Sequence, residues 1–421
     1  MQVYKFGGAS IATPDRMKAL LPIVNSAKQP VILVVSAIGK TTNALEKIVT
    51  AACQGDKDAA TRLMKQLEQE HLDYARQLLD DTYYKTAQAE LNICFTELQW
   101  AIDGADAARF DYSYDQVVSL GEICSTKLFS IYLQQEGLQQ EWVDIRDVLR
   151  TDDTYRDARV DLEYSEQQAK QVLGKLLDKG ISIVTQGFIG ATADNTSVTL
   201  GREGSDYTAA LLAAMLGAEG VTIWKDVEGL QNADPKLFPN TVKIEAITYH
   251  EVIEMAYYGA QVIHPKTIKP LQNNNIPLYV RCFLNKDLKG TVIQSEVSSI
   301  FYPPLIILKK DQVLLQVTTR DFSFITEDNL SRLYSIFHAL NVKVNLIQNA
   351  AISFVACIDN KDDKVQQLLQ VLGEDYKVFT NENVSLLTIR HFTPEVLFDL
   401  TKSRHILLEQ KTRQTVQVIM K

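Results

Sequence analysis

Three clusters of glycine and polar residues occur where a bound anion could be held. They are KFGGAS at residues 5–10, TQGFIG at residues 185–190 and GREGSD at residues 201–206. Each lies at the end of an expected strand or the start of an expected helix. There, glycines let backbone N–H groups approach an anion, and a helix N-terminus adds a favourable dipole. One cluster alone is as consistent with a tight turn as with a site, but three together favour a phosphate-binding crevice.

The elements that would position these clusters follow an α/β pattern. Short apolar strands alternate with helices, which predicts a largely parallel sheet. Ligands of such sheets bind beyond the carboxyl ends of the strands, so the three clusters could line one crevice. A polar, helical excursion is expected over about residues 43–115. The expected strands of this region are residues 2–6, 31–35, 141–145, 181–185, 221–224 and 278–282.

The pattern changes near residue 298. A strand, a helix, two strands, a helix and a strand follow over residues 311–383, which is the order of a ferredoxin-like α+β module. A shorter series with the same character covers residues 384–421, and residues 298–310 are assigned to it. We expect two related small modules, either in tandem or one inserted in the other, the second without a final helix.

Composition excludes several classes of protein. The 421 residues include 43 basic and 52 acidic side chains, a net charge of −9, which argues against binding along nucleic acid or an anionic membrane. The five cysteines form no C-x-x-C pair, so we expect neither a disulfide framework nor a zinc site. The apolar runs are far shorter than the roughly 20 residues of a membrane span. With no secretory signal at the N-terminus, the expected location is the cytoplasm.

Two common nucleotide-binding motifs are not present. The sequence Gly39-Lys40-Thr41 looks like the end of a P-loop, but the glycine that the motif needs five residues earlier is Val34. No G-x-G-x-x-G follows an expected strand, so a dinucleotide-binding domain is not supported.

Seven segments, in this order, resemble aspartate kinase. They are KFGGAS, VVSAIGKTTNAL at residues 34–45, SLGEICS at 119–125, TQGFIGA, TLGREGSDYTAALLA at 199–213, WKDVEGLQNADPK at 224–236 and AYYGAQVIHPKTI at 256–268. The first marks the wider amino-acid kinase fold, whereas GREGSDYTAALLA with GAQVIHP is narrower. The resemblance implies an α/β/α sandwich of the carbamate-kinase type over residues 1–297. It also implies tandem ACT regulatory modules over residues 298–421.

The resemblance implies transfer of the ATP γ-phosphate to the β-carboxylate of L-aspartate, giving 4-phospho-L-aspartate. This is the first step towards lysine, threonine, methionine and isoleucine. It also implies Mg²⁺ on the ATP phosphates rather than on protein side chains, a lysine or threonine effector at the ACT region, and a homodimer formed through that region.

The resemblance also assigns roles to individual residues. Lys5 and Asp206 would be catalytic, with Lys5 stabilising the transferring phosphoryl group and Asp206 orienting Lys5. Arg202 would bind the α-carboxylate of aspartate, and Glu122 would balance its α-ammonium. The aspartate-binding residues would be Ser36, Thr42, Glu122, Phe188, Arg202, Ser205 and Asp206. The ATP-binding residues would be Lys5, Gly7, Gly8, Lys225, Asp226, Asp234 and Lys236.

The sequence departs from the family pattern at several positions. Lys225 stands where many members have threonine, and Gln261 where they have lysine. We hypothesise that Lys225 supplies the charge that Gln261 lacks. In the first ACT module, Asp328-Asn329 occupies the stretch where the effector loop usually has a glycine. Residues 348–351 lack the Ser-Glu pair of lysine-responsive relatives. These changes put lysine or threonine feedback in doubt.

Two other functions stay open. The chain could be another amino-acid kinase, acting on glutamate or acetylglutamate, although such enzymes usually lack GREGSDYTAALLA and the tandem modules. It could instead be an amino-acid sensor that has lost catalysis. The intact set Lys5, Glu122, Arg202 and Asp206 argues against the sensor.

Overall fold

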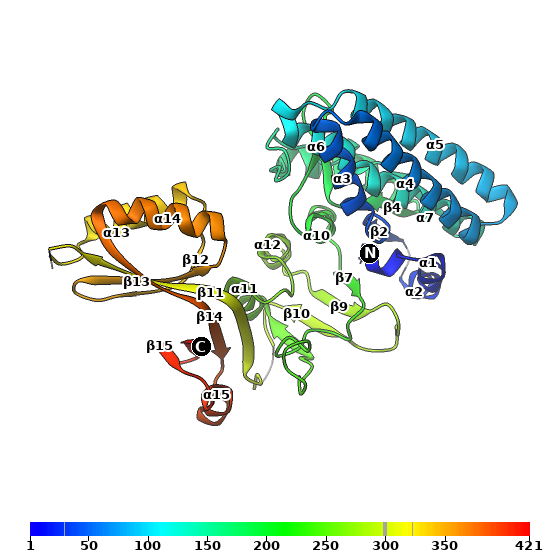
Figure 1. The fold of residues 1–421 in the computed structure, drawn as a ribbon. Coiled ribbons are helices and arrows are strands. Elements are labelled where there is room, and N and C mark those ends of the chain that lie inside the picture. Colours follow the sequence, from blue (N-terminus) through cyan, green and yellow to red (C-terminus); the bar gives the residue numbers. More distant parts are fainter. Residues whose placement is uncertain (29, 298–300, 322) are drawn as a thin grey trace. The chain divides into compact units, whose positions relative to one another are not determined.

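The computed structural model describes residues 1–28, 30–297, 301–321 and 323–421. The chain divides into two compact units (Figure 1). The first comprises Met1–Leu230, Lys243–Ile253 and Val262–Ser298, and the second Gln231–Val242, Glu254–Gln261 and Ser299–Lys421. The domain boundary expected at 297/298 adjoins residues 298–300, which lie outside the described residues. Residues 231–242 and 254–261, expected in the catalytic domain, cluster with the second unit.

An eight-stranded sheet forms the centre of the first unit, in the order β3–β4–β2–β1–β7–β9–β10–β8. All neighbouring pairs are parallel except β9 with β10. The predicted α/β class with a largely parallel sheet is therefore confirmed. The strands are β1 (Gln2–Phe6), β2 (Val31–Val35), β3 (Gln140–Val143), β4 (Ser182–Gln186), β7 (Gly220–Lys225), β8 (Ala246–Thr248), β9 (Leu278–Cys282) and β10 (Thr291–Gln294).

The central strands are covered on both faces. Every residue of β2 and β4 is buried, the pattern of parallel strands between helices. Helix α10 (Gly204–Leu216) packs on β1, β2 and β7, and helix α7 (Leu120–Gln135) packs on β2, β3 and β4. Both helices are buried on nearly all sides, which rigidly fixes the polar residues at their first turns.

The expected helical excursion corresponds to a group of antiparallel helices. Helices α3 (Thr41–Cys53), α4 (Lys57–Leu78) and α5 (Asp81–Asp103) lie side by side, and α6 (Phe110–Val118) follows them (Figure 1). The side chains of Asp56 and Asp80 cap α4 and α5, which explains where these helices begin. The other helices up to residue 298 are α1 (Pro14–Ala19), α2 (Leu21–Ser26), α8 (Leu162–Ala169), α9 (Lys175–Asp178), α11 (Tyr249–Tyr258) and α12 (Pro265–Asn273).

A six-stranded antiparallel sheet, β12–β13–β11–β14–β16–β15, forms the second unit with three helices. The order β12–β13–β11–β14 is that of a ferredoxin-like module, so this part of the fold prediction is also confirmed. The elements are β11 (Leu305–Thr319), α13 (Glu327–Ala339), β12 (Val344–Asn349), β13 (Ser353–Asp359), α14 (Asp362–Asp375), β14 (Tyr376–Arg390), α15 (Pro394–Thr401), β15 (Ile406–Lys411) and β16 (Thr415–Met420).

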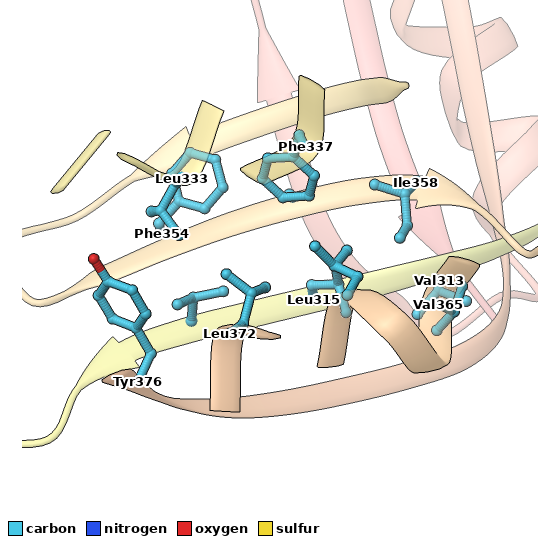
Figure 2. Packing of buried hydrophobic residues seen from close by; sticks show 12 residues of the cluster. Val313, Leu315, Leu333, Phe337, Phe354, Ile358, Val365, Leu372 and Tyr376 are labelled. Carbon is cyan, nitrogen blue, oxygen red and sulfur yellow. The ribbon is translucent and has the colours of Figure 1, made fainter. Parts of the chain in front are cut away.

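The first module has its own apolar core, between one face of the sheet and helices α13 and α14 (Figure 2). Phe354 is fully buried in it and contacts the rings of Phe337 and Tyr334. Truncating such a side chain to alanine costs about 3–5 kcal/mol. Helices α13 and α14 both contribute apolar side chains to this core, and burial of those side chains explains why the helices fold onto the sheet.

Two strands, β11 and β14, run through both modules. Each has 15 residues, and their pairing shifts register between Lys309 and Gln312 and again between Gln312 and Leu314. Asp311 and Asn383 adopt positive φ angles of 53° and 56° at this irregularity. The tandem modules thus share one sheet that is bent by a β-bulge, an arrangement the sequence pattern did not resolve.

Candidate active site

A cavity of about 540 Å³ opens at the carboxyl ends of β1, β2 and β4 and the start of α10, within the first unit. Residues from distant parts of the sequence meet there because parallel strands end at the same edge of the sheet. All eight residues predicted to be catalytic or to bind aspartate line it. They are Lys5, Ser36, Thr42, Glu122, Phe188, Arg202, Ser205 and Asp206.

Lys5 and Asp206 form an ion pair in this cavity. The Lys5 Nζ lies 2.6 Å from the Asp206 Oδ1, and the two side chains are 12% and 3% exposed. Lys5 comes from the end of β1 and Asp206 from the first turn of α10. A buried ammonium held by one carboxylate keeps a fixed position and can still donate to a second anion, since it carries three protons.

Glu122, in the first turn of α7, is a buried acid with one oxygen left unbonded. Its Oε1 accepts a hydrogen bond from the N–H of Ala37 at 3.3 Å. Its Oε2 has no partner among the described residues. Burial raises the pKa of Glu122 to about 8, although the Ala37 N–H and the Lys5 charge act in the opposite direction. A cation placed beside Oε2 would therefore be strongly favoured.

The turns around the cavity approach each other closely. The Ser36 Oγ donates to the Ser205 Oγ at 3.0 Å, which joins the end of β2 to the start of α10. Gly187 packs so tightly here that a Cβ atom would lie 2.5 Å from the Cβ of Ser205. Any other residue at position 187 would push α10 away from β4.

Four cationic side chains line the cavity: Lys5, Arg156, Arg202 and Lys225. The Lys225 Nζ donates to the carbonyl of Val262 at 3.0 Å and forms no ion pair with any residue that the structure describes. Arg202 makes no side-chain hydrogen bond or ion pair within the described parts of the chain. Positive charge thus exceeds what the neighbouring acids neutralise, as expected for a site that receives anions.

Three non-glycine residues of the lining have positive φ angles: Arg156 (70°), Phe188 (71°) and Glu203 (55°). Such backbone costs free energy and concentrates at functional sites. Glu203 is held in place because its Oε2 accepts from the N–H of His264 at 2.7 Å. His264 caps α12 by accepting from the N–H of Lys266 at 3.1 Å.

The predicted nucleotide residues are only partly brought together. Gly8 and Lys225 line the cavity, whereas Gly7, Asp226, Asp234 and Lys236 are not part of the lining. Asp226 is exposed. Asp234 and Lys236 belong to the second unit, where the Asp234 Oδ1 accepts from the N–H of Lys236 in a turn.

The lining also contains residues that sequence reasoning missed, notably Tyr114, Arg156, Thr199 and Glu203. Glu203 could have been found, since it lies inside GREGSD. Tyr114 and Arg156 could not, because no glycine-rich turn surrounds either of them in the sequence. Arg156 is held at the cavity by Asp115, which is fully buried and accepts from the N–H groups of both Arg156 and Thr199.

Among the described residues, no group of three or more His, Cys, Asp or Glu side chains is arranged to hold a metal ion. In the same residues, no helix combines the length and the apolar character needed to cross a membrane.

Comparison with known proteins identifies the family. A sequence model described as the amino acid kinase family matches residues 1–282. The lysine-sensitive aspartokinase 3 of Escherichia coli is 30% identical over 397 residues, covering 92% of this chain and 86% of that protein.

Solved structures agree in fold. The crystal structure of E. coli aspartokinase III in complex with aspartate and ADP (R-state) aligns with a TM-score of 0.83 at 27% identity, covering 100% of this chain and 96% of that one. The same enzyme in complex with lysine and aspartate (T-state) gives a TM-score of 0.80 at 28% identity, covering 100% and 95%. The chain therefore belongs to the amino acid kinase family and, within it, to the aspartokinases.

Proposed function

We propose that the cavity of the first unit is where this member of the aspartokinase family transfers the γ-phosphate of ATP to the β-carboxylate of L-aspartate. The product would be 4-phospho-L-aspartate. The observation that carries the proposal is the meeting of eight predicted residues in one cavity, with Lys5 and Asp206 already paired.

The reaction needs no general base. A carboxylate with a pKa near 4 is ionised at neutral pH and can attack phosphorus directly. The obstacle is charge, because two anions must approach in line. Lys5 would donate to the transferring phosphoryl group, together with the N–H groups of Gly7 and Gly8. Asp206 would keep the Lys5 ammonium aimed at that group.

The aspartate substrate would be held by groups of opposite charge. The planar guanidinium of Arg202 suits the two oxygens of the α-carboxylate. Glu122 would receive the α-ammonium at its unbonded Oε2. Ser36, Thr42 and Ser205 would supply hydroxyl groups, and Phe188 an apolar wall. Ammonium binding would favour the ionised form of Glu122, so we expect aspartate binding to release a proton.

ATP would add its own charge and its metal. Lys225 would meet the phosphates, and Asp226, Asp234 and Lys236 would border the nucleotide as the family resemblance implies. Two carboxylates of the lining are engaged, Asp206 with Lys5 and Glu203 with His264, and the third, Glu122, is proposed to receive the α-ammonium, which fits a metal that is carried by the phosphates. Mg²⁺ bound there would neutralise part of the phosphate charge.

The second unit would have regulatory and assembly roles over residues 298–421, and residues 1–297 would be catalytic. The ferredoxin-like fold of the second unit supports a regulatory role, as does the lysine bound in the T-state relative.

Homodimer formation through the second unit is supported by apolar side chains exposed near the edge of its sheet, Phe398 at 65% and Ile406 at 41%. Analytical ultracentrifugation would test the dimer. The cytoplasm remains the proposed location.

The experiment that tests the catalytic proposal is ADP release from Mg·ATP with L-aspartate, with hydroxylamine present to trap the acyl phosphate. We expect aspartate hydroxamate in amounts that match the ADP released. Parallel wells carry L-glutamate, N-acetyl-L-glutamate, and lysine or threonine with aspartate. A hydroxamate from glutamate alone would reassign the substrate. Tight binding of an amino acid without turnover would support a sensor instead.

A further inference from the structure

Arg156 adopts a backbone conformation that its residue type does not favour. Its φ is 70°, in the left-handed region, where an L-residue with a side chain costs free energy that glycine avoids. The position lies in the loop before α8, and the side chain lines the cavity. Strain of this kind persists only where surrounding contacts fix it, and it is a reason to look for a function.

The contacts that fix the strain come from one buried carboxylate. Asp115, which is fully buried on α6, accepts from the N–H of Arg156 at 2.9 Å. It also accepts from the N–H of Thr199 at 2.9 Å and from the Thr199 Oγ1 at 2.7 Å. The N–H of Ala158 donates to the carbonyl of Thr199 at 3.0 Å. The loop is thereby bound to β6 (Ser197–Thr199), the strand that leads into Gly201 and Arg202.

The guanidinium of Arg156 has two partners, Tyr114 and Asp111, and still has N–H donors to spare. Its Cζ lies 4.4 Å from the centre of the Tyr114 ring, and its Nη1 is 3.0 Å from the Asp111 Oδ1. Tyr114 is positioned by its hydroxyl, which donates to the Glu46 Oε1 at 2.7 Å. The Arg156 side chain stays 48% exposed. One pair uses one or two of its five N–H donors, so the others remain for a ligand.

Arg156 and Arg202 start from adjoining turns. The carbonyl oxygen of Arg156 lies 3.2 Å from the point where a Cβ on Gly201 would stand, and Arg202 is the next residue. Of the four cations in the lining, Lys5 is paired with Asp206, and Lys225 is bonded to a backbone carbonyl. The turn that carries Arg156 thus adjoins the turn that carries Arg202, the residue proposed to bind the α-carboxylate, and neither Lys5 nor Lys225 is as free to join Arg202 there.

We propose that Arg156 is a substrate-specificity residue, a second guanidinium that binds the α-carboxylate end of L-aspartate beside Arg202. The inference rests on the proposed function. It explains why the loop keeps a large cationic residue at a position whose backbone suits glycine. Aspartate would draw the guanidinium from the exposed Asp111 while the stack on Tyr114 holds its plane.

The test uses two variants that separate charge from strain. Arg156→Gly removes both the guanidinium and the backbone strain, whereas Arg156→Gln removes the charge and keeps the strain. Arg109→Gln is the matched control, since Arg109 stacks on Tyr112 at 4.1 Å in the same region but does not line the cavity. KM and kcat for aspartate, KM for ATP and the melting temperature are measured. Binding of L-aspartate and of its α-amide is followed by calorimetry.

We expect both Arg156 variants to raise KM and Kd for aspartate about tenfold, with kcat and KM for ATP within about twofold of wild type. The ratio of the Kd for the α-amide to the Kd for aspartate should fall by a similar factor in both Arg156 variants. Arg156→Gly should melt no lower than wild type, because relief of strain offsets the lost stack. Arg109→Gln should change none of these quantities.

Three results would overturn the inference. They are an aspartate KM within twofold of wild type in both variants, a rise in KM for ATP in place of aspartate, or a lower melting temperature with a lower kcat in Arg156→Gly. The last would mean a structural role. Failure of the proposed function is distinguishable, since wild-type protein would then form no aspartate hydroxamate. If wild type also failed to bind aspartate by calorimetry, both proposals would be wrong.

Discussion

Polar side chains in two regions of the molecule differ in whether they already have hydrogen-bond partners. The regions are the cavity of the first unit and a segment of the second unit, residues 319–321 and 323–329. In the cavity, Arg202 and the Glu122 Oε2 have no partner among the described residues. In the second unit, the Asp321 Oδ1 accepts from the N–H and the Oγ of Ser323. The Asn329 Oδ1 accepts from the N–H and the Oγ1 of Thr326 at 3.0 Å each.

These bonding patterns indicate that the cavity of the first unit, and not the segment of the second, is ready to bind a ligand. A buried group without a partner, such as the Glu122 Oε2, costs free energy that a complementary ligand restores, and the exposed Arg202 has no bond to give up before it binds one. Groups already bonded to their neighbours must break those bonds before they can bind anything else. In this chain Asn329 closes the start of α13 where the family's effector loop usually has a glycine. The comparison therefore predicts an active kinase with a weak effector response.

Replacing Lys5 by alanine should reduce the catalytic rate more than any other change considered. Loss of the ammonium removes the charge that would stabilise the transferring phosphoryl group. We expect kcat to fall by about 10²–10³-fold, measured as aspartate hydroxamate. The variant also leaves Asp206 buried without its cation, so the double variant Lys5→Ala/Asp206→Asn is the control for folding. Full activity in either folded variant would show that Lys5 is not catalytic.

Replacing Lys225 by alanine tests whether Lys225 compensates for Gln261, which stands where many family members have lysine. If Lys225 supplies the phosphate charge that Gln261 lacks, KM for ATP should rise about tenfold, or about 1.4 kcal/mol. KM for aspartate should stay within about twofold. The exposed Lys286→Ala provides the control, since it removes the same charge in a loop that does not line the cavity. Unchanged ATP dependence in Lys225→Ala would refute the compensation.

The acid Glu122 should make aspartate binding depend on pH. Its pKa of about 8 leaves it mostly neutral below that pH, whereas the α-ammonium of aspartate needs the carboxylate. Binding then requires loss of a proton, and KM for aspartate should fall by up to about tenfold per pH unit from about pH 6.5 to 8. Above about pH 8 it should level off. Steady-state kinetics across this range would measure it.

The Glu122→Gln variant is the control for this dependence. It keeps the shape of the neutral acid, so KM for aspartate should be high and flat across the range. A pH effect on stability should vanish as well. The folded-state pKa of about 8 exceeds the ordinary 4.5, so the stability that protonated Glu122 contributes declines as pH rises between these values. A wild-type KM that does not vary with pH would contradict the role of Glu122.

Much of the fold could be predicted because local patterns and packing agree. The β-branched run of β2 and the apolar helix α10 are buried on all sides, so burial dictates their composition. The three-residue strand β8 and the four-residue β10 carry too little pattern to be recognised. The continuity of β11 through both modules was also out of reach, because it depends on pairing with β14 some 70 residues later.

Some residues of the site could be predicted from the sequence, and others could not. Residues inside glycine-rich strand ends, such as Lys5 and Arg202, could be found because the backbone there needs special geometry. Arg156 could not, since its approach depends on hydrogen bonds to Asp115, 41 residues earlier in the chain. The nucleotide-binding roles of Asp234 and Lys236 stay predictions, and both residues belong to the second unit. Spacing in sequence shows which turns are special, and only tertiary contacts show which side chains meet.

The smallest expected effect comes from replacing Asn329, which bonds to Thr326 at the start of α13 in the second unit. Asn329→Ala removes the bonds to Thr326 and should destabilise the start of α13 by about 1 kcal/mol, or about 2–4 °C in melting temperature. Aspartate turnover should be unchanged, and lysine should inhibit wild type by less than about twofold. Asn329→Gly removes the same bonds and restores backbone freedom. Inhibition by lysine in that variant alone would mean that the bond between Asn329 and Thr326 masks an effector site. Strong inhibition of wild type would mean instead that a loop whose polar groups are already bonded can still open for a ligand, and the contrast between the two regions would fail.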